Sequence, residues 1–283
     1  MPRLFLCDLD GTLIRPGHPL SPETLAIMEH LVGQGDIVAI ASGRSLYAGR
    51  NILRPGMPLS YWLFSTGVGV LKWETQEIVC RNELTAEQAR YAAECLLEFQ
   101  EDFMIQGSVP ENHRFVYYKF NRRENEGTDF FTRCNAYTGL CEPFEPSGYA
   151  YQPASQLIAV LPPDAERIER IRAALKGYTV VRATSPMDNH SVWLEIFNPN
   201  AGKANAAKWL AQYCNIPQEN TYAIGNDYND LDMLNWAAHA FITPNAPDDM
   251  KAVFPVTESD TEGALPEAVA RWEHDSTRCT NVR

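Results

Sequence analysis

The sequence lacks the features that mark membrane, secreted and thiolate-metal proteins. Its 283 residues contain no run of about 18 apolar residues, the length that a bilayer-spanning helix needs. The 7 cysteines are scattered, odd in number and without a Cys-x-x-Cys pair, which favours reduced thiols over a disulfide framework. The apolar stretch before the first acidic residue is too short for a signal peptide. We therefore expect a cytoplasmic protein with no membrane association.

Basic residues are also scarce. The chain has 24 lysines and arginines against 36 aspartates and glutamates, a formal net charge of −12. With no basic cluster to offset this charge, binding to nucleic acid or to anionic membranes is disfavoured. The 6 histidines show neither His-x-His nor His-Glu-x-x-His spacing, so no zinc site is predicted. An anionic substrate would need locally placed cations, and a bound metal would be oxygen-ligated.

Both ends of the chain alternate between short apolar runs and helical patterns. Near the N-terminus we expect strands at 4–7, 37–41 and 61–64 and a helix at 22–32 that starts after Ser21. Beyond residue 187 we expect strands at 193–197, 222–224, 240–242 and 253–256, helices at 203–214, 230–237, 246–252 and 264–272, and a frayed end at 273–283. Such alternation predicts an α/β fold with a doubly wound, mostly parallel sheet.

Residues 84–187 have a different character. Here we expect helices at 86–100 and 165–176, strands at 103–106, 115–120, 156–161 and 178–183, and a further segment at 124–137. This pattern predicts an α+β domain, an open sheet with helices on one face, inserted into the α/β fold. The predicted division is therefore a core of residues 1–83 and 188–283 and a cap of residues 84–187.

The most informative stretch is the apolar run that ends in Asp8 and Asp10. Two carboxylates at the carboxyl end of a buried strand, followed by the turn-forming Gly11, concentrate negative charge where an open α/β sheet binds ligands. Mg²⁺ suits such a position, because it binds to one or two carboxylates together with water and substrate phosphate oxygens. The alternative is a solvated turn, since Asp and Gly are common turn formers.

Two further predicted strands also end in polar residues. Ser42 and Gly43 follow the strand at 37–41, and the acidic loop 226–230 follows the strand at 222–224. Parallel strands place these ends along one crevice. Lys203 opens a helix, so its ammonium and the helix amino end can both face an anion. Each feature alone has an ordinary interpretation as a turn, a surface lysine or a helix-capping acid. Together they predict a metal and phosphate site.

These motifs resemble those of the haloacid dehalogenase superfamily of phosphatases. The matching segments are Asp8-Leu9-Asp10-Gly11-Thr12-Leu13, Ala41-Ser42-Gly43-Arg44, Lys203 and Gly225-Asn226-Asp227-Tyr228-Asn229-Asp230. The insertion between the second and third segments is similar to the large α/β cap of the Cof-type branch. The resemblance implies a phosphatase that acts on a sugar phosphate or another small phosphomonoester.

The resemblance also implies a role for each matching position. Asp8 would be the nucleophile that forms an aspartyl phosphate, and Asp10 the general acid and base. Contacts to the phosphoryl group are expected from Thr12, Ser42, Gly43 and Lys203. Ligands of Mg²⁺ are expected among Asp8, Asp10 through its main-chain carbonyl, Asn226, Asp227 and Asp230. Substrate contacts are expected from Arg44, Thr66 and Gly67.

Two positions depart from the family pattern. Asn226 stands where the superfamily usually has aspartate, and Thr66-Gly67-Val68 stands where the branch often has Asn-Gly-Ala. In the cap, candidates for contact with a polar leaving group are Arg114, Lys119, Arg122, Arg123, Arg182, Asn189 and His190.

The expected function is Mg²⁺-dependent hydrolysis of a small phosphorylated metabolite, with a sugar phosphate as the first choice. We expect a monomer or a homodimer. Two alternatives remain open: a sugar phosphomutase that uses the same aspartyl phosphate, and a non-catalytic sugar-phosphate sensor, for which Asn226 is the argument.

Overall fold

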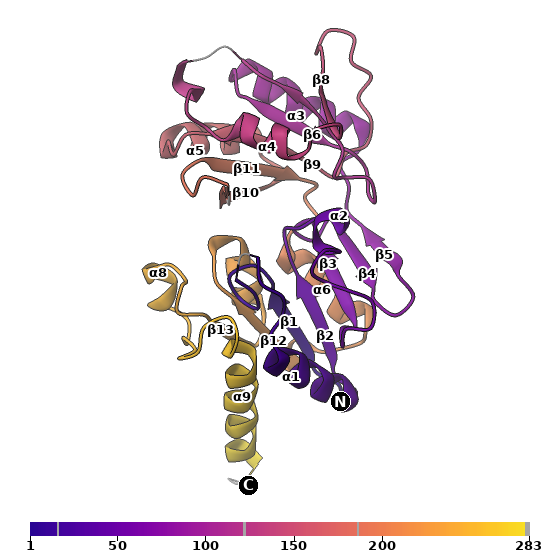
Figure 1. Cartoon of the computed structure of the whole chain (residues 1–283), viewed down its shortest axis with the longest axis vertical. Coiled ribbons are helices and arrows are strands. Elements are labelled where there is room, and N and C mark those ends of the chain that lie inside the picture. The colour runs from indigo at the N-terminus through magenta and orange to yellow at the C-terminus, as the bar shows by residue number, and fades with distance from the viewer. Residues whose placement is uncertain (16, 121–122, 186, 281–283) are drawn as a thin grey trace. The chain divides into compact units, whose positions relative to one another are not determined.

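The computed structural model describes residues 1–15, 17–120, 123–185 and 187–280, which form two compact units (Figure 1). The first unit comprises Met1–Arg44, Gly49–Cys80 and Lys203–Arg283, and the second comprises Ser45–Ala48 and Arg81–Gly202. Each unit is built around its own sheet. The candidate Arg122 lies outside the described residues.

The first sheet is mostly parallel. Its strands are β1 (Leu4–Asp8), β2 (Ile37–Ala41), β3 (Tyr61–Phe64), β4 (Gly69–Lys72), β5 (Glu77–Arg81), β12 (Thr221–Gly225) and β13 (His239–Ile242). They are ordered β13-β12-β1-β2-β3-β4-β5, with parallel pairing from β13 to β3 and an antiparallel β3–β4 pair. The residues that follow β1, β2, β3, β12 and β13 therefore gather along one edge of this sheet.

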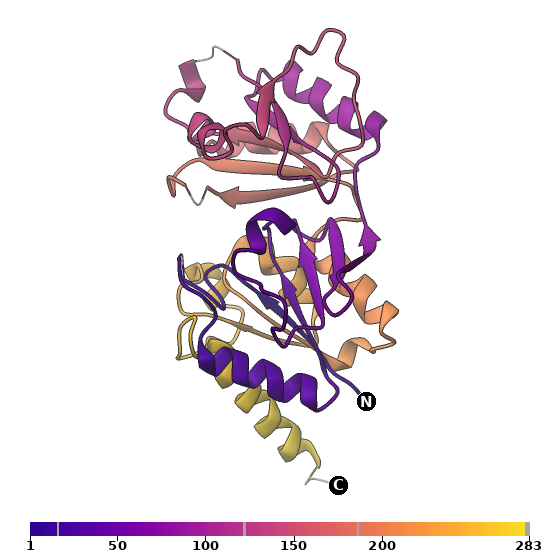
Figure 2. The same cartoon turned by 45° about the vertical axis from the view of Figure 1, so that its right-hand side comes forward.

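Helices cover both faces of the first sheet. The helices of this unit are α1 (Pro22–Gly33), α6 (Lys203–Tyr213), α7 (Leu231–Trp236), α8 (Asp248–Lys251) and α9 (Ala264–Thr280), with short 3₁₀ turns η2 (Gln218–Asn220) and η3 (Tyr228–Asp230). The short helix α2 (Leu46–Gly49) belongs mostly to the second unit. One face buries Leu6 and Leu63 against α6 and α7. On the other face Phe5 contacts Trp272 of α9, and α1 lies beside α9 (Figure 2). The predicted doubly wound α/β fold is confirmed.

The second sheet is mainly antiparallel. Its strands are β6 (Phe103–Gln106), β7 (Phe115–Tyr118), β8 (Cys141–Pro143), β9 (Gln156–Leu161), β10 (Thr179–Thr184) and β11 (Val192–Phe197), ordered β10-β11-β9-β6-β7-β8. Among the strand pairs described for this sheet, the β7–β8 pair is parallel and the others are antiparallel. The accompanying helices are α3 (Ala86–Glu98), α4 (Phe130–Ala136) and α5 (Ala165–Ala174), with the 3₁₀ turn η1 (Arg123–Asn125).

Two expectations about the inserted region are wrong. The strand expected at 193–197 in the core sheet is β11 of the second sheet, where it pairs antiparallel with β9 and β10. Its alternate residues Val192, Leu194 and Ile196 pack in the same hydrophobic cluster as residues of α3 and α5. The strand therefore buries its apolar side chains in the core of the second unit. Helices also cover both faces of this sheet, because Phe130 and Cys134 of α4 pack on the opposite face.

Three expectations about the first unit also differ from the structure. Strands β4 and β5 were not expected. Residues 253–256 make no strand, only a single bridge from Val256 to Ile242, because Pro255 has no N–H to donate to a ladder. Helix α9 continues to Thr280 instead of fraying after residue 272, and no glycine or proline interrupts it beyond Pro266.

Candidate active site

A buried lysine joins two buried carboxylates at the edge of the first sheet. Asp8 ends β1, Lys203 begins α6, and Asp230 lies in η3 after β12. The Lys203 Nζ donates to Asp8 Oδ1 and to Asp230 Oδ1, each at 2.6 Å. The exposed fractions are 4% for Asp8, 2% for Lys203 and 0% for Asp230. The structure thus brings together three of the residues that the sequence placed in the site.

Asp230 also holds the loop that follows β12. Its Oδ2 accepts the backbone N–H of Asn226 at 2.9 Å and that of Asp227 at 3.2 Å. A Cβ on Gly225 would lie 2.7 Å from the Asp230 Cβ, so the absence of a side chain there lets Asp230 approach. Asp227 Oδ1 accepts from the N–H of Tyr228 and caps η3. Both carboxylates therefore have protein partners, and their ligation of a metal stays a prediction.

Oxygen atoms converge beside Asp8. Its Oδ2 accepts from Thr12 Oγ1 at 2.8 Å. One terminal atom of the Asn226 carboxamide lies 3.1 Å from Thr12 Oγ1 and 3.2 Å from both Asp8 Oδ2 and the Asp10 carbonyl oxygen. With Nδ2 at that position, Asn226 donates to all three oxygens. With Oδ1 there, Asp8, Asp10 and Asn226 present three facing oxygens, an arrangement that a cation between them would stabilise.

The Asp8, Asp10 and Asn226 oxygens fit a hard divalent cation. One carboxylate, one main-chain carbonyl and one carboxamide form the all-oxygen donor set that Mg²⁺ prefers, with further positions left for water and phosphate oxygens. Across the described residues, no three His, Cys, Asp or Glu side chains are grouped to hold a metal ion. A metal at this position would therefore depend on the Asp10 carbonyl and on the Asn226 amide.

Gly11 and Asn245 lie next to the Asn226 side chain. Gly11 has φ +83°, and a Cβ there would lie 2.3 Å from Asn226 Nδ2, so only glycine fits. Asn245 Nδ2 donates to the Gly11 carbonyl at 3.0 Å. Asn245 was not predicted from the sequence. It follows β13, so the rule that located Ser42 and Asn226 at strand ends would have found it.

The Asp10 side chain pairs with Arg44. Arg44 Nε donates to Asp10 Oδ2 and a terminal guanidinium nitrogen donates to Oδ1, both at 2.7 Å. Such a bidentate, charge-assisted pair fixes both side chains in one geometry. Because the Asp10 side chain is 44% exposed, its carboxylate remains accessible to solvent. Arg44 was expected to contact substrate, and the structure adds that it holds Asp10.

Ser42, Gly43, Thr66 and Gly67 lie side by side after β2 and β3. The Ser42 Oγ accepts from Arg44 N at 3.1 Å, and the Ser42 carbonyl accepts from Thr66 N at 3.0 Å. Ser65, Thr66 and Gly67 have φ of +49°, +54° and +81°, three successive left-handed residues. Each such non-glycine residue costs about 1–3 kcal/mol, a strain that proteins concentrate at functional sites.

The buried charges shift one another's pKa. Burial, followed by the charge of Asp230, raises the pKa of Asp8 to about 7, although Lys203 and Thr12 act in the opposite direction. Burial lowers the pKa of Lys203, but Asp230 and Asp8 raise it more strongly, so Lys203 stays cationic. Two carboxylates and one ammonium leave one negative charge in the cluster. A cation beside Asp8 would favour its ionised form.

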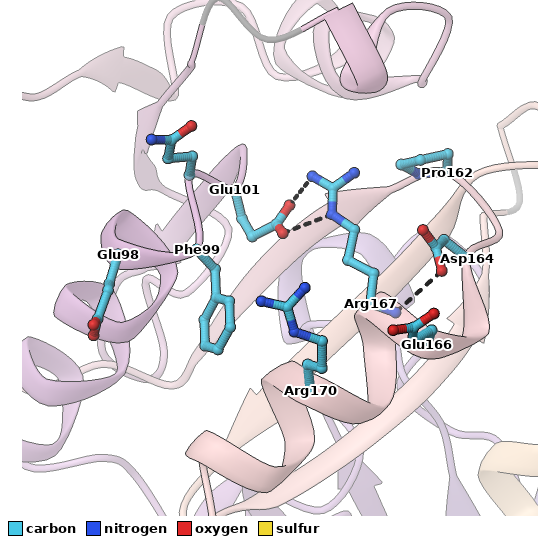
Figure 3. Close-up of a pocket in the computed structure, with 9 residues that line it drawn as sticks. Glu98, Phe99, Glu101, Pro162, Asp164, Glu166, Arg167 and Arg170 are labelled. Atoms are coloured by element: carbon cyan, nitrogen blue, oxygen red, sulfur yellow. Dashed lines mark hydrogen bonds and ion pairs between the residues drawn. The ribbon is translucent and has the colours of Figure 1, made fainter.

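A pocket of about 440 Å³ lies elsewhere, entirely within the second unit (Figure 3). Figure 3 shows Arg167 turned toward Glu101, with which it forms an ion pair, while Arg170 lies next to Phe99. None of the residues predicted for the phosphate or metal site lines this pocket. Of the cap candidates, Lys119 is already paired with the buried Asp102.

Comparison with known proteins agrees with this geometry. Residues 5–269 match the family of haloacid dehalogenase-like hydrolases, and the chain belongs to that family. Phosphatase YwpJ of Bacillus subtilis is 26% identical over 271 residues, covering 89% of this chain and 92% of that protein. The 5-amino-6-(5-phospho-D-ribitylamino)uracil phosphatase YwtE of the same species is 24% identical over 281 residues, covering 91% and 93%.

A solved sugar phosphatase of haloacid dehalogenase subclass IIB has the same fold, with a TM-score of 0.66 at 16% identity, over 90% of this chain and 93% of that one. The predicted superfamily is confirmed, and the predicted type of enzyme, a phosphatase of this superfamily, is the type to which the curated relatives belong.

Replacement of Lys203 tests the buried cluster. Lys203→Met leaves Asp8 and Asp230 buried without their cation, so we expect the free energy of unfolding to fall by about 3–5 kcal/mol. Urea denaturation followed by circular dichroism measures the change. Lys208→Met, on the exposed side of the same helix, is the matched control and should change stability by less than about 0.5 kcal/mol. Equal losses in the two variants would contradict the cluster's role.

Proposed function

We propose that the protein is a Mg²⁺-dependent phosphatase that hydrolyses a small phosphomonoester, with a sugar phosphate as the expected substrate, through an aspartyl phosphate on Asp8. The observation that carries the proposal is the Asp8 carboxylate, fixed by Lys203 at the end of β1 with the Asp10 carbonyl oxygen and the Asn226 carboxamide beside it. Membership of the family and the phosphatase activity of the curated relatives support it.

In the proposed reaction, a carboxylate oxygen of Asp8 attacks the phosphorus atom and the bond from phosphorus to the ester oxygen breaks. The departing alcohol oxygen takes a proton from Asp10. A water molecule then attacks the phosphorus of the aspartyl phosphate and gives a proton to Asp10. Inorganic phosphate leaves, and the Asp8 carboxylate is restored. For these steps Asp10 must turn from its pairing with Arg44 toward the substrate, and its accessible position at the rim supports this movement.

Lys203 is the main proposed cation for the phosphoryl group. Its ammonium has three N–H bonds, of which Asp8 and Asp230 take two, so the third is left for a phosphoryl oxygen. The Ser42 hydroxyl, the Gly43 N–H and the Thr12 hydroxyl are the further donors we assign to this group, and the Thr12 hydroxyl would turn from Asp8 Oδ2 to donate. Fixed donors of this kind stabilise the charge that spreads over the transferring oxygens.

Asp8, the Asp10 carbonyl and Asn226 are the residues we assign to Mg²⁺, with Asp227 and Asp230 as predicted contributors from the same loop. The metal would supply positive charge to the phosphoryl oxygens. It would also offset the raised pKa of Asp8 and keep the nucleophile ionised. Because Asn226 is neutral, this site has one negative ligand fewer than a site with aspartate at that position.

Further observations bear on the substrate class and the location. A relative that acts on a ribityl phosphate and a sugar phosphatase with the same fold support a sugar phosphate or sugar-alcohol phosphate as the substrate.

The free thiols of the described cysteines support a reducing, cytoplasmic location. No helix in the described part of the chain combines the length and the apolar character needed to cross a membrane. A monomer or homodimer stays a prediction.

Asp8→Asn tests the nucleophile. The amide cannot form the aspartyl phosphate, so phosphate release from a panel of sugar phosphates with Mg²⁺ should fall below detection, while the wild type loses activity with chelator. Asp232→Asn, on the exposed start of α7, is the matched control and should retain full activity. Release by the Asp8 variant at more than a few per cent of the wild-type rate would refute the covalent scheme. Isomerisation of sugar phosphates without release would indicate the mutase, and binding without turnover the sensor.

The raised pKa of Asp8 predicts pH-dependent metal binding. Asp8 with a pKa of about 7 is mostly protonated at pH 6 and mostly ionised at pH 8, and only the ionised form is a ligand. The Mg²⁺ dissociation constant should therefore be about tenfold weaker at pH 6 than at pH 8 by isothermal titration calorimetry. Asp8→Asn should bind Mg²⁺ with little dependence on pH. Equal affinities of the wild type at both pH values would remove Asp8 from the metal site.

A further inference from the structure

Two free thiols lie next to each other in the second unit. Cys134 is in helix α4 and Cys141 begins strand β8. The Cys141 Sγ donates a hydrogen bond to the main-chain carbonyl oxygen of Cys134 at 3.4 Å. Because this carbonyl belongs to the same residue as the Cys134 thiol, the hydrogen bond brings the Cys141 sulfur close to that thiol. The two residues are therefore neighbours in space as well as in the sequence.

The turn between α4 and β8 produces this approach. The Cys134 carbonyl also accepts from the Tyr137 N–H at 3.2 Å, and the Tyr137 carbonyl accepts from the Leu140 N–H at 2.8 Å. Gly139 has φ +81°, a left-handed conformation that glycine adopts without steric cost. The chain therefore reverses its direction over residues 137–140 and brings Cys141 back beside the end of α4.

The pairing of β7 with β8 places Cys141 on the face of the sheet that α4 covers. Cys141 is the direct partner of Phe115 in the parallel ladder. Phe115, Phe130 and Cys134 pack in one hydrophobic cluster, and Cys141 packs against the same cluster. A disulfide requires two Cβ atoms that are close together and directed toward each other. Both thiols lie on one face of the second sheet, as this requirement demands.

The two thiols differ in accessibility and in ionisation. Cys134 is 7% exposed, whereas Cys141 is only partly buried and is one of the residues that line a cavity of about 310 Å³. Burial, together with the neighbouring Cys141, raises the pKa of Cys134 to about 12. Burial also raises the pKa of Cys141, but the Cys134 thiol and the charge of Arg133 act in the opposite direction. Cys141 is therefore the thiol that a reagent in solution meets first, and Cys134 is placed to react second.

We propose that Cys134 and Cys141 form a reversible disulfide by exchange with a low-molecular-weight disulfide. In the first step the Cys141 thiolate attacks one sulfur of the reagent, whose S–S bond breaks and releases one thiolate. In the second step the deprotonated Cys134 attacks the Cys141 sulfur, and the other half of the reagent leaves as a thiolate. The protein loses two protons and two electrons, and the reagent is reduced to two thiols.

The disulfide would join the end of α4 covalently to β8. Because only a thiolate attacks, the raised pKa values of both cysteines make the exchange slow at neutral pH. The pair would therefore remain a dithiol in a reducing location and become oxidised when small disulfides accumulate. This link lies within the second unit and does not depend on the phosphatase reaction.

Peptide mass spectrometry is the first test. Trypsin cleaves after Arg133 and Arg167, so the peptide of residues 134–167 contains both cysteines and no other. The folded chain would be incubated with about 5 mM oxidised glutathione at about pH 8.5, quenched with acid and alkylated. We expect this peptide to lose two hydrogen atoms and to escape alkylation, and dithiothreitol to restore both thiols. Two alkylated thiols, or a stable glutathione adduct on Cys141, would overturn the proposal.

Single substitutions test the order of the two steps. In Cys134→Ser the adduct on Cys141 has no thiol to displace it, so the peptide should keep one glutathione. In Cys141→Ser the buried Cys134 should react at least about tenfold more slowly than Cys141 does in Cys134→Ser. Cys95→Ser removes a partly buried thiol of α3 and is the matched control, which should form the disulfide at the wild-type rate. Faster reaction of Cys134 than of Cys141 would overturn the assigned order.

A comparison of the folded and unfolded chain tests whether the fold positions the pair. The ratio of disulfide to dithiol in the same peptide would be measured in mixtures of reduced and oxidised glutathione, with and without about 8 M urea. We expect the equilibrium constant for disulfide formation to be at least about tenfold larger in the folded chain, because the fold already holds the two thiols together. An equal or smaller constant in the folded chain would overturn the proposal.

Discussion

The buried Lys203 ammonium between Asp8 and Asp230 is the interaction on which the rest of the site depends. Charges removed from water are tolerated only when they are paired and hydrogen-bonded, so the three groups must meet. Their meeting fixes the end of β1, the first turn of α6 and the loop after β12 against one another. A parallel sheet provides this geometry because it brings the carboxyl ends of its strands to one edge.

The environment of Asn226 then determines what the site can hold. Its carboxamide lies against Asp8, Thr12 and the Asp10 carbonyl, and Gly11 leaves room for it. In this arrangement the Asp10 carbonyl oxygen lies beside the proposed metal position, and the Asp10 side chain pairs with Arg44. One aspartate can thus contribute in two ways, its carbonyl to the proposed metal site and its carboxyl to proton transfer.

Sequence reasoning succeeded where a residue's place followed from its position at a strand end. Asp8, Ser42 and Asp230 were predicted from the strands that end before them, and Lys203 from the helix that it opens. The structure brings Asp8, Lys203 and Asp230 into contact at the edge of the first sheet. It failed for Val192–Phe197, because a buried apolar strand has the same sequence pattern in either sheet, and that pattern does not identify β9 and β10 as its pairing partners.

The Asp10–Arg44 pair was not visible in the sequence for a related reason. It depends on side-chain geometry that only the folded chain defines.

The most direct measurement of the central claim is chemical trapping of the phosphoenzyme. The protein would be mixed with Mg²⁺ and a sugar phosphate that it hydrolyses, and the reaction would be quenched. Borohydride, which reduces an aspartyl phosphate to homoserine, would then be added. The account predicts homoserine at position 8 by peptide mass spectrometry and unmodified aspartate at positions 10 and 230. Turnover with unmodified Asp8, or homoserine at another aspartate, would contradict it.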